Sequence, residues 1–177
     1  PVMRVGGMQF FRAEAFDTFG KVLPRASDIA LGLLRVYLIL SAVIYVTYLA
    51  IGMAPMDALI NAMGTVSTGG FSSSDASFTA YPGAAEYLGA LFMIAAALPY
   101  VRYLQLLGGA AGPLWRDEQI RLFLRSLAIG VAIATIWGAL HEGVPLERAF
   151  RESLFNIASI TTGTGFFSGT FSTWEGP

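Results

Sequence analysis

Two short polar stretches in an otherwise apolar chain carry the residues best suited to bind an ion. The first reads Ser67-Thr68-Gly69-Gly70-Phe71 and the second reads Thr162-Gly163-Thr164-Gly165-Phe166. Glycine permits backbone angles that let several carbonyl oxygens face one cation, and Ser and Thr hydroxyls can add oxygen ligands. Neither stretch contains an acidic residue. Neutral oxygens suit a weakly hydrated monovalent cation better than Ca²⁺ or Mg²⁺, which favour carboxylates or retained water.

The two stretches are related by an internal repeat. An offset of ninety-five residues aligns Gly70 with Gly165 and Phe71 with Phe166. The same offset matches further pairs: Asp57 with Glu152, Leu59 with Leu154, Asn61 with Asn156, Ser73 with Ser168 and Ser77 with Ser172. A self-match at one fixed offset predicts a structural unit that is used twice. We expect Asn61 and Asn156 to hold the loops by hydrogen bonds, while Ser67 and Thr162 could either bind the ion or support the loops.

The composition is that of a membrane protein. Of the 177 residues, 55% are hydrophobic and only 13% are charged, whereas soluble domains carry about 25% charged residues. The net charge of −1 gives no indication of nucleic-acid binding. The chain has no cysteine and one histidine, which excludes disulfides and thiolate metal sites. We expect no cofactor in this chain.

The predicted elements are all helical and of two lengths. Apolar stretches long enough to cross a bilayer are predicted at 29–53, 84–101 and 119–140, with Pro99 expected to kink or end the second. Shorter apolar helices at 54–66 and 145–160 each precede a glycine loop, at 67–72 and 162–167. Their length fits re-entrant helices, whose negative C-terminal ends would point at a permeating cation. Arg35, inside the first span, is expected to extend to the headgroups or to pair within the bundle.

The distribution of basic residues predicts the orientation in the membrane. Nearly all of them lie in or beside the charged connectors, and only Arg148 and Arg151 lie on the side of the glycine loops. The positive-inside rule therefore puts the connectors in the cytoplasm and the loops toward the outside. The repeat unit is span, short helix, loop and span. It divides the chain into the end of one repeat with its connector, a complete repeat, a second connector and half of another repeat: 1–28, 29–107, 108–118 and 119–177.

Other interpretations of the glycine loops stay open. They could be packing turns in a membrane scaffold or sensor that transports nothing. A nucleotide-binding loop would need a strand-to-helix setting and a Gly-Lys-Ser/Thr sequence, and neither is present. Asp57 and Glu152 are interpreted as helix-start charges that could also attract cations. An enzyme is not expected, because the spans after Arg35 offer no Asp, Glu, His or Lys at depth.

Motifs along nearly the whole chain resemble one transporter family. They are Gly6-Gly7-Met8-Gln9 with Arg12 and Glu14, Ser67 to Ser72 with Asp75 and Ser77, Trp115-Arg116-Asp117-Glu118 with Arg121, and Thr161 to Phe166. Together they resemble the membrane subunit of bacterial Trk-type potassium uptake systems, in the Trk/Ktr/HKT superfamily. The resemblance implies a piece of a longer inner-membrane polypeptide with four span–loop–span repeats around a pore, as in potassium channels. Its missing repeats, the lipid bilayer, a second copy in a homodimer and a cytoplasmic nucleotide-binding regulatory subunit would be its partners.

The resemblance also implies a potassium selectivity filter. Its ligands would be backbone carbonyls of Thr68, Gly69, Gly70 and Phe71 in one loop and of Gly163, Thr164, Gly165 and Phe166 in the other. The second loop departs from the first, since Gly163 replaces Thr68 and Thr164 replaces Gly69, which puts a filter of four equivalent loops in doubt. The family's gate would lie in the second half of the third repeat. A sodium-permeable or Na⁺/K⁺-coupled relative is the alternative in the same class.

Overall fold

The structure is a computed structural model that describes residues 26–169 except 111 and 142. The predicted end of a first repeat (residues 1–25) and Ser172 lie outside the described residues. The described part is all-helical, in agreement with the predicted class. Its elements are α2 (Ala26–Ala50), α3 (Pro55–Val66), the 3₁₀ helix η2 (Ser77–Ala80), α4 (Ala84–Ala97), α5 (Tyr100–Leu107), α6 (Gly112–Arg116), α7 (Glu118–His141) and α8 (Leu146–Thr162).

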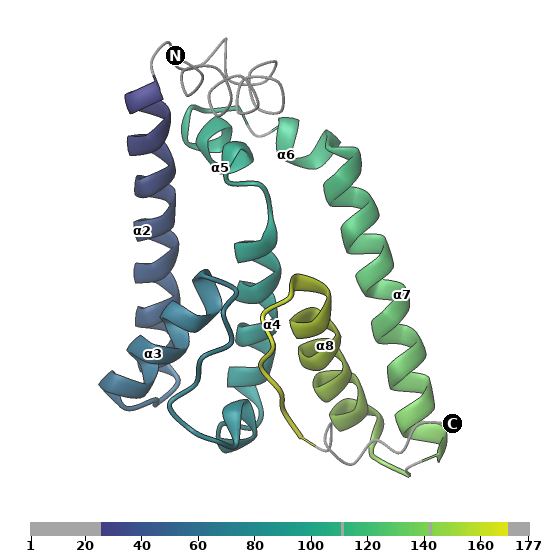
Figure 1. The fold of residues 1–177 in the computed structure, drawn as a ribbon. Coiled ribbons are helices and arrows are strands. Elements are labelled where there is room, and N and C mark those ends of the chain that lie inside the picture. Colours follow the sequence, from purple (N-terminus) through teal and green to yellow (C-terminus); the bar gives the residue numbers. More distant parts are fainter. Residues whose placement is uncertain (1–25, 111, 142, 170–177) are drawn as a thin grey trace, which may run out of the picture.

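Long and short helices alternate in space as well as in sequence (Figure 1). The stretches Ser27–Ala50 and Glu118–His141 are long and apolar enough to cross a membrane, and α4 with α5 would form a third, bent span. The shorter α3 and α8 run from the lower end in Figure 1 only part of the way up, and the chain after each turns back toward that end. Helices α5 and α6 lie at the opposite end, where α7 begins.

Helix length explains why α3 is re-entrant. Its 12 residues extend about 18 Å at about 1.5 Å per residue, well short of a hydrocarbon core of about 30 Å. Pro55 occupies the first turn, where its missing N–H costs nothing, and Asp57 lies in the same turn at the positive end of the helix dipole. Helix α8 starts in the same way, after Pro145 and with Glu147 in its first turn.

Pro99 interrupts the predicted span 84–101. Helix α4 ends at Ala97 and the chain bends by 90° into α5, which agrees with the kink or end expected at Pro99. Leu98 is extended (φ −72°, ψ 150°), as expected before a proline, and Pro99 has no N–H to give to the carbonyl of Ala95. That carbonyl instead accepts from the Leu98 N–H at 3.3 Å and from the Tyr103 hydroxyl at 2.6 Å. The proline therefore turns the chain without leaving the Ala95 oxygen unpaired.

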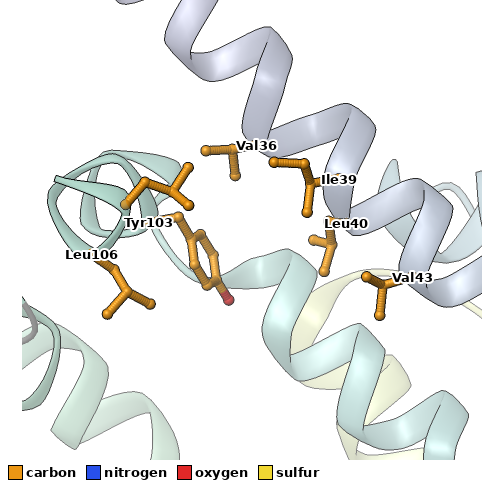
Figure 2. A pocket seen from close by; sticks show the side chains of 7 residues that line it. Val36, Ile39, Leu40, Val43, Tyr103 and Leu106 are labelled. Atoms are coloured by element: carbon orange, nitrogen blue, oxygen red, sulfur yellow. The ribbon is translucent and has the colours of Figure 1, made fainter. Parts of the chain in front are cut away.

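Helix α5 packs against the first half of α2. The side chain of Leu104 fills the space beside Gly32, where an added Cβ would lie 2.8 Å from it. Between the two helices is an apolar cavity of about 130 Å³, and Figure 2 shows Val36, Ile39, Leu40 and Val43 of α2 facing Tyr103 and Leu106 of α5. The bend at Pro99 thus gives α2 a second apolar neighbour.

An ion pair connects α5 to the start of α7. Arg102 Nη2 lies 2.6 Å from Asp117 Oδ2, and Asp117 also accepts hydrogen bonds from the backbone N–H groups of Gln119 and Ile120. Burial would raise the pKa of the Asp117 carboxyl, but the bonds from Arg102 and from these N–H groups outweigh it and lower the pKa below its ordinary value of 3.8. The carboxylate therefore stabilises the fold above that pH, and this stabilisation is lost as the pH falls through the lowered pKa.

The core forms where the two repeats meet, around Phe78 of η2. Its ring centroid lies 4.8 Å from that of Phe155 in α8 and 4.9 Å from that of Phe166 in the second glycine loop. Tyr48 of α2 meets Phe78 edge-on at 5.8 Å. All four side chains are buried. Packing between the repeats therefore fixes the glycine loop at 162–167 against the complete repeat at 29–107.

Candidate cation path

The two glycine loops lie in direct contact. A Cβ at Gly70 would overlap the carbonyl oxygen of Thr164, so the two backbones touch at this point. Further along, the N–H of Phe78 donates to the Phe167 carbonyl at 3.1 Å, and the N–H of Phe167 donates to Ser77 Oγ at 3.3 Å. The structure thus brings together two loops that are far apart in the sequence.

Both loops leave their helices through the same pair of hydrogen bonds. The Gly69 N–H donates to the Gly64 carbonyl at 2.9 Å, and its repeat equivalent, the Thr164 N–H, donates to the Ser159 carbonyl at 2.9 Å. The inner bonds match too, each at 3.1 Å: Thr68 N–H to Thr65 carbonyl and Gly163 N–H to Ile160 carbonyl. The outer bond closes a turn of six residues and the inner bond a turn of four, and this pair of bonds is the Schellman motif of helix C-termini.

The backbone conformations of the loops also match. Thr68 and Gly70 have positive φ angles of 49° and 66°, and their equivalents Gly163 and Gly165 have 74° and 88°. A left-handed residue directly after the helix is what the Schellman motif requires, and glycine adopts it without strain. The sequence departure of Gly163 from Thr68 therefore leaves the conformation unchanged. Thr68 is the strained member, because a β-branched residue rarely has φ above zero.

The loop carbonyls have no hydrogen-bond partner among the described residues. They are the carbonyl oxygens of Thr68, Gly69, Gly70 and Phe71 in one loop and of Gly163, Thr164, Gly165 and Phe166 in the other. Backbone carbonyls inside a protein are almost always paired. At membrane depth an unpaired carbonyl is tolerated where it lines a water-filled or ion-filled path. The described residues therefore leave these oxygens without a protein donor.

The side-chain hydroxyls beside the loops bond within the chain. Ser67 Oγ donates to the Met63 carbonyl at 2.7 Å, and Thr68 Oγ1 donates to the Ser67 carbonyl at 2.8 Å. In the other loop, Thr162 Oγ1 and Thr164 Oγ1 lie 2.7 Å apart. The protons of Ser67 and Thr68 are thus committed to the protein, which leaves lone pairs on these oxygens. Ser67 bonds back onto α3, as a residue that supports the loop would.

The end of α3 is closed by its own chain and by a tyrosine. The Met63, Gly64 and Thr65 carbonyls accept from loop N–H groups, and the Val66 carbonyl accepts from the Tyr100 hydroxyl at 3.2 Å. A cation in front of this helix would therefore experience its negative end without binding its carbonyls. The equivalent of Val66 is Thr161, whose carbonyl accepts no hydrogen bond within the described part of the chain.

Asn61 and Asn156 occupy equivalent positions but behave differently. Asn156 Nδ2 donates to the Ser168 carbonyl at 2.9 Å, and the Ser168 N–H donates to Asn156 Oδ1 at 3.0 Å. Asn156 thus holds its loop, as predicted. Asn61 is also fully buried, but neither its Oδ1 nor its Nδ2 has a hydrogen-bond partner among the described residues. Ser73, the equivalent of Ser168, lies exposed.

The two predicted acids at the helix starts are both engaged by the protein. Asp57 Oδ2 accepts a hydrogen bond from the Tyr81 hydroxyl at 2.9 Å. The pKa of Tyr81 is raised, mainly because the hydroxyl is partly buried and also because it bonds to this carboxylate. Glu152 lies in the second turn of α8, is buried, and pairs with Arg148 at 2.7 Å. It is therefore not a helix-start charge.

Sequence reasoning missed the residues that hold the two short helices from outside. They are Tyr48, Tyr81 and Tyr100 around α3, and Glu86, which pairs with Arg151 of α8. A signal was present for Glu86, which is the one acid of α4 and follows Gly83 at capping-box spacing. No comparable signal marked the tyrosines, because aromatic residues are common in apolar helices.

No family model matches the chain. It is 38% identical over 98% of its length to the Trk system potassium uptake protein TrkI of Halomonas elongata. It is 31% identical to the Trk system potassium uptake protein TrkH of Vibrio parahaemolyticus and 30% identical to TrkG of Escherichia coli, again over 98% of its length. The chain spans 36% of the TrkI relative and 37% of the other two.

A solved structure agrees with these relatives. The crystal structure of the potassium transporter TrkH from Vibrio parahaemolyticus superposes with a TM-score of 0.80 at 27% identity, over 88% of this chain and 34% of that one. The names describe transport proteins and no enzyme, as the sequence led us to expect. These comparisons show that the chain is a multi-pass membrane protein that is similar, over nearly its whole length, to one part of the Trk system potassium uptake proteins.

Proposed function

We propose that this chain forms two of the four quadrants of a potassium-conducting pore, with α3 and α8 as pore helices. The observation that carries the proposal is the matched pair of loops. Both have the same helix-terminating hydrogen bonds and the same left-handed positions, and both leave four successive carbonyls unpaired among the described residues. Two independent sequences, with Thr68 in one and Gly163 in the other, converge on one backbone shape.

The ligands of the ion would be backbone oxygens of Thr68 to Phe71 and of Gly163 to Phe166. Carbonyl dipoles can replace the hydration shell of K⁺, and the negative ends of α3 and α8 would favour a cation between them. Remaining repeats of the same polypeptide would complete the ring. Phe71 supports this, because it is 76% exposed while its equivalent Phe166 is buried against the neighbouring repeat unit. We infer that Phe71 packs in the same way on a repeat outside this chain.

The cellular setting follows from the same proposal. The chain would lie in the bacterial inner membrane with the loops toward the outside and the connectors at α5 and α6 in the cytoplasm. Arg102, Arg116, Arg121 and Arg125 all lie at the connector end, in agreement with the positive-inside rule. A homodimer and a cytoplasmic nucleotide-binding regulatory subunit are proposed from the family resemblance alone.

The test is K⁺-limited growth of cells that lack their own K⁺ uptake, supplied with the polypeptide that carries these residues together with its remaining repeats. Gly70→Asp should abolish rescue, because Gly70 has φ +66° and no room for a Cβ. Gly109→Asp is the matched control, since Gly109 has φ +88° but open space around it and follows α5, outside both glycine loops. Equal loss in both variants would argue against the filter assignment. A well-inserted parent that supports Na⁺ flux but not growth at low K⁺ would favour the sodium-permeable alternative, and no flux at all would favour the scaffold.

A further inference from the structure

A buried carboxylate in the second repeat contacts the chain at the exit of the third-repeat loop. Glu86 lies in the first turn of α4 and is 1% exposed. Its Oε1 accepts a hydrogen bond from Ser168 Oγ, and its Oε2 pairs with Arg151 Nη1 of α8. Oε2 also accepts from the N–H of Gly83 at 2.6 Å. One side chain thus joins the start of α4, the body of α8 and the residue that lies three positions after Gly165.

Ser168 has no free polar group. Its N–H and carbonyl are bonded to the Asn156 side chain, and its hydroxyl is bonded to Glu86. Asn156 and Arg151 both belong to α8, so Ser168 is fixed to its own pore helix and, through Glu86, to the neighbouring repeat. The equivalent serine of the other loop, Ser73, is exposed and lacks this arrangement.

Glu86 has a charged partner in this buried position. Arg151 is 12% exposed and lies between Glu86 and Glu147, with its Nε 3.1 Å from Glu147 Oε1. The Tyr87 hydroxyl donates to the same Glu147 oxygen at 3.1 Å. A buried carboxylate needs such a partner together with further hydrogen bonds, and Glu86 has both.

We propose that Glu86 is a positioning residue for ion selectivity, which acts by holding the third-repeat loop through Ser168. The inference rests on the proposed function. A filter discriminates between K⁺ and Na⁺ only if its carbonyls keep their spacing, and a loop held at one end by its helix and at the other by Glu86 can do so. The structure gives this role to a residue that touches no ion.

The experiment measures K⁺ and Na⁺ transport by the complete polypeptide in liposomes, with Glu86→Ala, Glu86→Gln, Ser168→Ala and the control Ser73→Ala. Ser168→Ala removes the loop contact and keeps the ion pair. It should lower the K⁺/Na⁺ ratio about tenfold, as changes to residues that orient ligands commonly do. Glu86→Ala should lower the K⁺/Na⁺ ratio at least as far as Ser168→Ala does. The double variant, Glu86→Ala with Ser168→Ala, should lower it no further than Glu86→Ala alone, because both substitutions remove the same contact. Glu86→Gln should retain part of the ratio, since its amide oxygen can still accept from Ser168. Ser73→Ala should match the parent.

A second readout does not depend on transport. Hydrogen exchange of the peptide that contains residues 163–169 should accelerate in Glu86→Ala and Ser168→Ala and stay unchanged in Ser73→Ala. Unchanged exchange together with an unchanged K⁺/Na⁺ ratio in Ser168→Ala would overturn the inference, even if Glu86→Ala failed to insert. A parent without K⁺ transport would refute the proposed function instead, and the exchange data would still decide whether Glu86 holds the loop.

Discussion

The two pore helices carry matched loops but are held by different chemistry. Helix α3 is held by three tyrosine hydroxyls, one from each of three neighbouring segments. Tyr81 donates to Asp57 at 2.9 Å, Tyr48 lies 3.0 Å from Thr65 Oγ1, and Tyr100 donates to the Val66 carbonyl at 3.2 Å. Helix α8 is held mainly by a charge and an amide: Arg151 pairs with Glu86 of α4, and Asn156 bonds to Ser168 after the loop.

The part that the two repeat units share is the part to which we assign the function. The helix end and the loop backbone are the same in both units, while the outer contacts have diverged completely. A neutral hydrogen bond contributes about 1 kcal/mol, whereas removing one partner of a buried ion pair costs about 3–5 kcal/mol. We therefore expect α8 to be the more sensitive of the two helices to single substitutions.

The largest expected effect is a difference in ion uptake between substitutions at the two proposed filter glycines, Gly70 and Gly165. Gly70→Ala would push a methyl group into the Thr164 carbonyl, whereas Gly165→Ala meets no described atom within 4 Å and is opposed only by its φ of +88°. We expect Gly70→Ala to reduce Rb⁺ uptake by about 100-fold or more, and Gly165→Ala by about tenfold. Uptake assays at matched membrane expression check this. The reverse order would mean that contact between these two loops is not what positions Gly70.

The next prediction compares the two asparagines. Asn156→Leu leaves the buried N–H and carbonyl of Ser168 without partners and should destabilise the protein by about 3 kcal/mol. Asn61→Leu replaces a buried side chain that has no hydrogen bond in the described part and should be neutral or stabilising by about 1 kcal/mol. Apparent melting temperatures in nanodiscs measure both. A large loss in Asn61→Leu would indicate that Asn61 has a partner outside the described residues.

A smaller effect is expected at the end of α3. Tyr100→Phe removes the donor to the Val66 carbonyl and should cost about 1 kcal/mol of stability. Tyr45→Phe is the control, because the Tyr45 hydroxyl makes no hydrogen bond among the described residues. If the freed carbonyl turns into the path, the apparent affinity for K⁺ should change as well. Equal melting temperatures and equal K⁺ dependence in both variants would exclude a role for Tyr100 in closing the helix.

The smallest effect should be favourable. Thr68→Gly gives the first loop the residue that the second has at Gly163, and it removes a β-branched side chain from a left-handed position. We expect a gain of up to about 1 kcal/mol with retained K⁺ uptake. Thermal unfolding and uptake of the single variant test it. A strong loss of uptake would show that the Thr68 hydroxyl, and not only the backbone shape, belongs to the filter.

Much of the fold could be predicted because a bilayer reduces the alternatives. Apolar length separated the spans from the short helices, and Pro55, Pro99 and Pro145 marked where helices begin or break. The break at Pro99 was predicted, but its angle of 90° was not, and neither was the hydrogen bond from the Tyr103 hydroxyl to the Ala95 carbonyl. That bond joins two segments only after the chain has bent.

The sequence alone determined that the chain contains two repeat units, in each of which a glycine loop follows a short helix. Spacing, apolar length and glycine content are local properties, so they can be read without the structure. It also determined the resemblance to Trk-type potassium uptake proteins. Only the tertiary structure decided that Gly163 stands where Thr68 does in conformation, that the loop carbonyls are left unpaired among the described residues, and that Glu86 of one repeat holds Ser168 of the next. The Glu86 contact joins residues far apart in the chain, and it exists only once helices from both repeats have packed around Phe78.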